Sequence, residues 1–238
     1  MDILSFFDSN QYSRCIVCGC LVKKDKCAIL CEKICVCENC HNHLPIVPVG
    51  STFAEKNGYV GYSMSTFFYK SPIRELIIDY KFNNCSSYSK VFAEYMKIYI
   101  SAIAKDIYAD LIIPVPLSKE RYKERKYNQA QLLSEPLAEA MGIPHSSNAL
   151  MRIMPTVHQS RLPSYKRGEN LKDAFMADPD QVKNKSILLI DDVYTTGNTL
   201  KACAYALHNA GAGSIAAYTL ARKFKIDKSK EYAELLNN

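Results

Sequence analysis

One segment near the carboxyl end restricts the possible fold more than any other part of the sequence. Four apolar residues at 187–190 precede the acids Asp191 and Asp192, and a short turn then leads into a helical pattern. A buried strand that ends in carboxylates and passes through a glycine turn into a helix is typical of open α/β sheets, which bind ligands at the carboxyl ends of their strands. The segment therefore predicts a ligand site at that edge of a parallel sheet.

The turn itself has the composition of a phosphate site. Unpaired N–H groups and the positive end of the helix dipole favour an anion at a helix start, and Gly197 lets the backbone approach it. The carboxylates suit sugar hydroxyls or a divalent cation held through water, because they would repel the phosphate. An ordinary capped helix needs only one acid, so it explains less of the pattern. The candidate ligands here are Asp191, Asp192, Val193, Tyr194, Thr195, Thr196, Gly197, Asn198 and Thr199.

The rest of the chain alternates strand and helix patterns. Helical patterns that separate successive strand patterns favour an α/β fold with a mainly parallel sheet flanked by helices. Pro136 is expected to kink or split one of the helices. The expected strands are 59–69, 111–113, 186–190 and 214–220, and the expected helices are 87–104, 128–141 and 199–210, the last ended by Gly211.

Eight of the ten cysteines fall between Cys15 and Cys40. The amino terminus lacks a secretory signal, so the thiols should stay reduced, which favours metal binding over disulfides. The pairs Cys15-x2-Cys18 and Cys37-x2-Cys40 predict a structural Zn²⁺ held by four thiolates. A second zinc remains open for Cys20, Cys27, Cys31 and Cys35.

Two prolines at 45 and 48 mark a boundary between a zinc ribbon, residues 1–48, and a second domain, residues 49–238. Residues 1–48 hold five basic and five acidic side chains, so the net charge of +6 lies in the second domain. No apolar run reaches the roughly 18 residues that a membrane span needs. We therefore expect a cytoplasmic protein without membrane insertion.

The segment 187–199 resembles the signature of the type I phosphoribosyltransferases, which bind 5-phosphoribosyl-1-pyrophosphate (PRPP). That resemblance implies acids on the ribose hydroxyls, a turn around the 5′-phosphate and Mg²⁺ bound with PRPP. Further segments resemble the ComF family, which is related to these enzymes and associated with competence. They are Tyr80-Lys81-Phe82, Pro114-Val115-Pro116-Leu117, Arg121, Arg125, Asn128-Gln129, Arg152, Thr156, Gln159, Leu162, Arg167, Asn170 and Ala174-Phe175.

One position departs from the family pattern. The family commonly has Arg-Gly-Phe-Asn-Gln, whereas this chain has Lys126 in place of the glycine. Losing that glycine removes easy access to positive φ, so a different local turn is expected.

The resemblance also implies where the pyrophosphate binds. The loop Pro116-Leu117-Ser118 should offer backbone N–H groups, and Arg121 and Arg125, one helical turn apart, should face the ligand. Residues 152–170 would form a lid that brings Arg152 and Arg167 to the pyrophosphate when it closes. Lys81 would reach the pyrophosphate from the part of the chain that covers the site, which is called the hood in these enzymes. The competing interpretation of Arg121 and Arg125 is a solvated helix face, and that of the lid is a polar connecting loop. The competing interpretation of Lys81 is an ordinary surface lysine.

Three functions fit this sequence. The ComF resemblance implies a PRPP-binding protein of natural transformation that handles incoming single-stranded DNA with the DNA-uptake machinery, and several tyrosines are compatible with base stacking. A metabolic phosphoribosyltransferase acting on a nucleobase or amine fits equally, with Asp191 and Asp192 as its catalytic candidates through electrostatic assistance. The third is a regulator that senses PRPP and passes the signal on through the ribbon.

Overall fold

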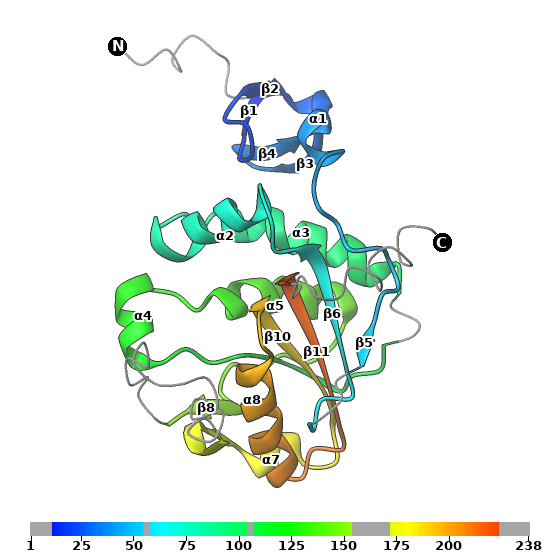
Figure 1. The fold of residues 1–238 in the computed structure, drawn as a ribbon, viewed down its shortest axis with the longest axis vertical. Helices are drawn as coiled ribbons and strands as arrows, with labels where there is room; N and C mark the ends of the chain where they lie inside the picture. The colour runs from blue at the N-terminus through cyan, green and yellow to red at the C-terminus, as the bar shows by residue number, and fades with distance from the viewer. Residues whose placement is uncertain (1–10, 55–57, 104–106, 154–171, 224–238) are drawn as a thin grey trace.

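The computed structural model describes residues 11–54, 58–103, 107–153 and 172–223 (Figure 1). Its main sheet has the strand order β5-β6-β11-β10-β7, and every neighbouring pair except β5–β6 is parallel. The prediction of a mainly parallel sheet is confirmed. The strands are β5 (Phe53–Ala54), β6 (Tyr62–Phe68), β7 (Leu111–Pro114), β10 (Ser186–Tyr194) and β11 (Ser214–Arg222).

Helices cover the main sheet and bury alternate side chains of strand β10 in two cores. Leu188 and Ile190 lie in the core that includes α2, α3 and α5, whereas Ile187 and Leu189 lie in the core that includes α8. Both faces of the strand are buried, which explains its continuous apolar run. The helices are α2 (Ile73–Phe82), α3 (Tyr88–Ser101), α4 (Lys119–Arg125), α5 (Gln129–Met141), α7 (Pro179–Val182) and α8 (Asn198–Asn209), and a small hairpin pairs β8 (Leu150–Arg152) with β9 (Phe175–Ala177).

Helix α5 corrects one expectation. It runs unbroken to Met141 with Pro136 inside it, so the proline does not split the helix. Proline removes one backbone hydrogen bond, but Leu133 and Leu137 are fully buried on this helix, and their packing outweighs that loss. None of the helices in the described ranges is both long and apolar enough to cross a bilayer.

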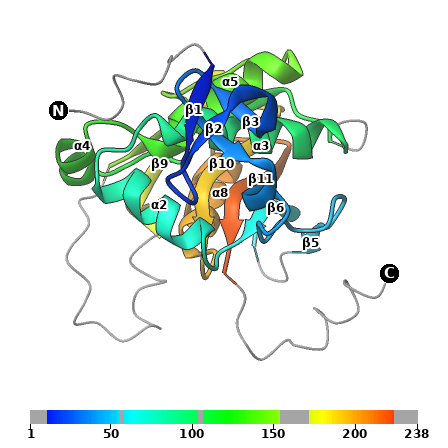
Figure 2. The ribbon, with the colours of Figure 1, turned by 90° about the horizontal axis from the view of Figure 1, so that it is seen from above.

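A second, smaller sheet lies against helix α3 (Figures 1 and 2). Buried Cys15, Cys35 and Val36 of this sheet belong to the same hydrophobic core as Tyr95 of α3. The ring of His41 stacks on Tyr95, and its Nδ1 lies 2.9 Å from the Tyr95 hydroxyl. The sheet is therefore joined to the main body by apolar contact as well as by the chain. Its elements are β1 (Tyr12–Cys15), β2 (Leu21–Lys23), β3 (Cys27–Cys31) and β4 (Ile34–Cys37), in the order β2-β1-β4-β3, followed by helix α1 (Glu38–His41).

Short segments border both edges of the main sheet. On one side, Ile46 forms an isolated antiparallel bridge to Phe67 of β6. On the other side, His145 forms a parallel bridge to Ile112 of β7. These bridges satisfy backbone groups at edges where β5 and β7 are only two and four residues long.

Candidate functional site

The site is built where strand β10 ends. The strand runs to Tyr194 rather than ending at Ile190, because it stays paired with β11 as far as the Tyr194–Arg222 position. Since successive side chains of a strand point to opposite faces, Asp192 faces α2 and Asp191 faces α8. The two predicted acids therefore lie on either side of the sheet at its carboxyl edge.

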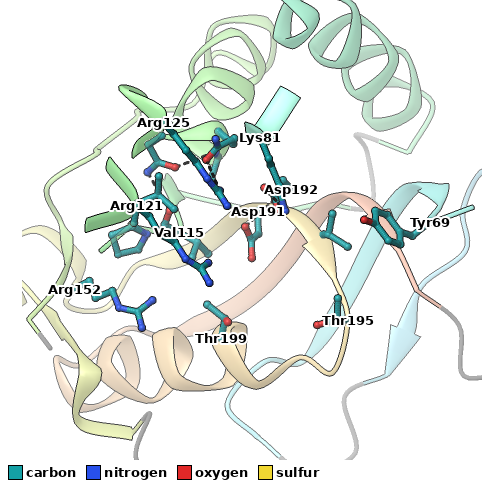
Figure 3. Close-up of a pocket in the computed structure, with 16 residues that line it drawn as sticks. Tyr69, Lys81, Val115, Arg121, Arg125, Arg152, Asp191, Asp192, Thr195 and Thr199 are labelled. Carbon is teal, nitrogen blue, oxygen red and sulfur yellow. Dashed lines mark hydrogen bonds and ion pairs between the residues drawn. The ribbon is translucent and has the colours of Figure 1, made fainter. Parts of the chain in front are cut away.

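Both acids line a cleft of about 330 Å³ (Figure 3). The loop after β7, strand β10, helices α2 and α4 and the starts of α5 and α8 all contribute to its walls. Four cationic side chains and two carboxylates face it, so its charge favours a ligand with several negative charges. The lining residues are Tyr69, Lys81, Val115, Pro116, Leu117, Arg121, Arg125, Asn128, Gln129, Ala130, Arg152, Asp191, Asp192, Val193, Thr195 and Thr199.

The two acids have different electrostatic surroundings. Burial, together with the neighbouring Asp192 carboxylate, raises the pKa of Asp191 to about 7, although Lys81 acts in the opposite direction. The Oδ1 atom of Asp191 accepts a hydrogen bond from the Asp192 amide at 2.8 Å. Asp192 is instead paired with the Lys81 ammonium at 2.8 Å. At pH 7 Asp191 is thus about half protonated, whereas Asp192 is held by a cation.

Three arginines form the opposite wall. Arg125 is only 8% exposed, and it donates to Gln129 Oε1 at 3.1 Å while lying over the ring of Phe82. Burial lowers the pKa of Arg125, and burial with the nearby Arg121 lowers that of Arg152. Arginine remains charged through shifts of this kind, so these guanidinium groups offer fixed donors for phosphate oxygens.

The turn before α8 is shaped by Gly197. This residue has a φ of +75° and occupies the N-cap position of the helix. A Cβ added there would lie 2.5 Å from the Tyr194 hydroxyl, so both the backbone and the space require glycine. Thr195 and Thr199 line the cleft on either side of this turn.

Some predicted residues lie outside the lining. Four residues of the predicted segment do not line the cleft: Tyr194 at the end of β10, Thr196 and Gly197 in the turn, and Asn198 at the start of α8. Ser118 is buried and caps α4, accepting a hydrogen bond from the Arg121 amide. Arg167 lies outside the described residues, as does most of the expected lid, so their roles remain predictions.

Five lining residues were not among the predicted ligands. Tyr69 and Val115 directly follow strands β6 and β7, so the rule that ligands gather at strand ends could have found them. Asn128 belongs to the motif of the resemblance, where it had no role, and its Nδ2 donates to the Val115 carbonyl at 3.1 Å. The five are Tyr69, Val115, Asn128, Gln129 and Ala130.

Lys126 corrects the expected change in the turn. It is the C-cap of α4 and has a φ of +67°, the left-handed conformation that glycine adopts easily. The chain therefore keeps positive φ at this position with a lysine, held by the hydrogen bond from its amide to the Tyr122 carbonyl at 2.7 Å.

The smaller sheet brings together the two predicted cysteine pairs. The sulfur atoms of Cys15, Cys18, Cys37 and Cys40 all lie within 4.8 Å of one another. Four converging thiols fit a tetrahedral metal of the zinc type. Within the described ranges no second cluster of this kind is found, so Cys20, Cys27, Cys31 and Cys35 do not form another four-sulfur site there.

Comparison with known proteins agrees with this architecture. Residues 119–235 match the sequence model of the phosphoribosyl transferase domain. Competence protein F of Haemophilus influenzae is 33% identical over 65% of this chain and 69% of its own length. Competence protein ComFC of Bacillus subtilis is 32% identical over 66% of this chain and 63% of its own, and DNA utilization protein YhgH of Escherichia coli is 28% identical over 90% and 92%.

The fold is that of a phosphoribosyltransferase-type domain. Within that class, the chain belongs to the competence protein F (ComF) family. The resemblance given by its sequence motifs is thereby confirmed.

Proposed function

We propose that this protein binds PRPP in the cleft at the end of β10. The observation that carries the proposal is that the two acids, the threonines Thr195 and Thr199 on either side of the Gly197 turn, and the arginine wall line one cavity. The N–H groups at the start of α8, with Thr195 and Thr199, take the 5′-phosphate. Asp191 and Asp192 accept from the ribose hydroxyls, and Arg121, Arg125 and Arg152 hold the pyrophosphate.

Magnesium is part of this proposal. The carboxylate oxygens of Asp191 and Asp192 are the hard donors that Mg²⁺ prefers, and the bound ion would neutralise charge on the leaving pyrophosphate. The chain's own residues orient the sugar and hold both of its anionic ends. Such positioning accelerates displacement at the anomeric carbon without a nucleophile in the protein.

We further propose that residues 1–48 form a zinc ribbon and residues 49–238 the PRPP-binding domain. The support is the cluster of Cys15, Cys18, Cys37 and Cys40. Thiolates complete a closed zinc site with no position for a substrate, so the metal is structural.

The cellular role that we propose is natural transformation. Relatives named for competence or DNA utilization support it. In this role the protein acts in the cytoplasm, where it handles incoming single-stranded DNA and works with the DNA-uptake machinery. The surplus of positive charge in residues 49–238 is compatible with a phosphate backbone.

Calorimetric titration with PRPP in the presence of Mg²⁺ tests the ligand. We expect saturable binding by the wild-type protein and its loss in the double variant Asp191→Asn, Asp192→Asn, whose side chains keep their size but lose their charge. Circular dichroism checks that this variant is folded. Undiminished affinity in the folded variant would refute the site.

The role is tested by repeating the titration with single-stranded DNA present. Salt-sensitive binding of DNA without release of pyrophosphate supports the role in transformation. Pyrophosphate release with a nucleobase or amine would instead identify a metabolic phosphoribosyltransferase, which uses the same cleft.

A further inference from the structure

The cleft contains one ion pair with an unusual position. The Lys81 ammonium lies 2.8 Å from each of the two carboxylate oxygens of Asp192. The two side chains are only 19% and 11% exposed, whereas those of the Arg74–Glu75 pair are about half exposed. Lys81 comes from α2 and Asp192 from β10, so the pair ties the helix above the cleft to the sheet below it (Figure 3).

This pair occupies the carboxylate that the ligand needs. Asp192 cannot offer both oxygens to a ribose hydroxyl or a magnesium ion while the ammonium sits against them. Removing the partner of a buried charge leaves that charge uncompensated, which is costly in a partly desolvated site. A ligand that takes Asp192 must therefore also give Lys81 a new anionic partner.

The geometry shows which end of a sugar phosphate can do so. Figure 3 shows Lys81 and Arg125 on one side of the two acids and Thr195 and Thr199 on the other. A phosphate bound at the threonine turn lies away from Lys81. Only a second anionic group, attached at the far end of the sugar, lies on the side of the ammonium. Lysine has a flexible stem and three donors, so it can turn from the carboxylate to such a group.

We propose that Lys81 makes the site selective for a sugar that carries both a phosphate and a diphosphate over a sugar monophosphate. A monophosphate must open the Lys81–Asp192 pair without replacing it. A diphosphorylated sugar replaces it with a contact between Lys81 and the diphosphate. This inference rests on the proposed function of the cleft and assigns its selectivity to one residue.

The experiment compares two probes, PRPP and ribose 5-phosphate, at one fixed Mg²⁺ concentration. Calorimetry measures the affinity of the wild type, of Lys81→Met and of Lys123→Met, which removes an exposed lysine of α4 as a matched control. We expect Lys81→Met to bind PRPP at least about tenfold more weakly and ribose 5-phosphate several-fold more tightly, which narrows the ratio of the two affinities. Lys123→Met should leave that ratio unchanged.

Different outcomes distinguish a failure of the selectivity proposal from a failure of the proposed function. If the wild type binds neither probe, both the selectivity proposal and the proposed function are wrong. If the wild type binds both probes and Lys81→Met changes neither affinity, or weakens both equally, the selectivity proposal falls and the function stands. If Lys81→Met does not fold, Lys81→Gln is measured in its place, and it must narrow the ratio in the same direction.

Discussion

Asp191 and Asp192 are adjacent in the chain, yet they are held in different electrostatic surroundings. Strand geometry turns Asp192 toward Lys81, whereas Asp191 points toward α8 and is partly buried beside a second carboxylate. Burial and like charge both disfavour the ionised form of Asp191. The cleft thus stores an electrostatic cost at Asp191.

That cost predicts a pH-dependent gain in stability from Asp191→Asn. The native pKa of about 7 lies above the ordinary value of 3.8 for an aspartate side chain. Native Asp191 therefore keeps a proton that the unfolded chain releases, and stability falls as pH rises from about 4 to 7. Without added ligand or Mg²⁺, the variant should gain on the order of 2 kcal/mol more at about pH 8 than at about pH 5.5 in urea unfolding.

The control for this prediction is Asp25→Asn, which changes an exposed carboxylate of the smaller sheet. It should show no comparable difference between the two pH values. If Asp191→Asn gains the same stability at both pH values, the pKa of Asp191 is not raised in the native protein.

Lys126 leads to a second prediction at the scale of the residue. An L-residue with a φ of +67° bears a steric cost that glycine avoids. Lys126→Gly should therefore stabilise the protein by about 1 kcal/mol, measured by urea unfolding. Lys123→Gly, inside α4, should destabilise it by a similar amount because glycine disfavours the helix interior. A loss of stability in Lys126→Gly would contradict the assignment of strain.

At the scale of elements, the turn into α8 depends on one glycine. Gly197→Ala adds both the cost of positive φ and a contact with the Tyr194 ring. Gly142 has a φ of +64° with nothing near its absent Cβ, so Gly142→Ala adds only the first cost. We expect losses of about 2 kcal/mol or more for Gly197→Ala and about 1 kcal/mol for Gly142→Ala. Equal losses in thermal unfolding would show that Tyr194 moves aside freely.

Elements defined by local pattern could be predicted from the sequence. The strand before Asp191, the turn at Gly197 and the helix after it are contiguous, so one short segment carries all their signals. The local rule that proline splits a helix failed at Pro136, because it ignores the packing of α5. The Lys81–Asp192 contact joins residues 111 positions apart, so no local pattern could show it.

For the molecule as a whole, the shared core of the smaller sheet and α3 predicts that the metal stabilises more than the ribbon. Cys18→Ser should release zinc and lower the midpoint of one cooperative thermal transition by about 5–15 °C. Cys85→Ser, a cysteine outside the cluster, should keep both metal and midpoint. Two separate transitions, with the main one unmoved, would show that the two sheets unfold independently.

The bridges of Ile46 and His145 at the two borders of the main sheet have a consequence for behaviour at high concentration. An open row of backbone donors and acceptors recruits extended segments from other molecules, which is a common start of aggregation. Here the outermost strands are short and backed by neighbouring loops of the same chain. The main sheet gives other copies of the protein little template for adding a strand, and the bridging residues Ile46 and His145 do not line the cleft.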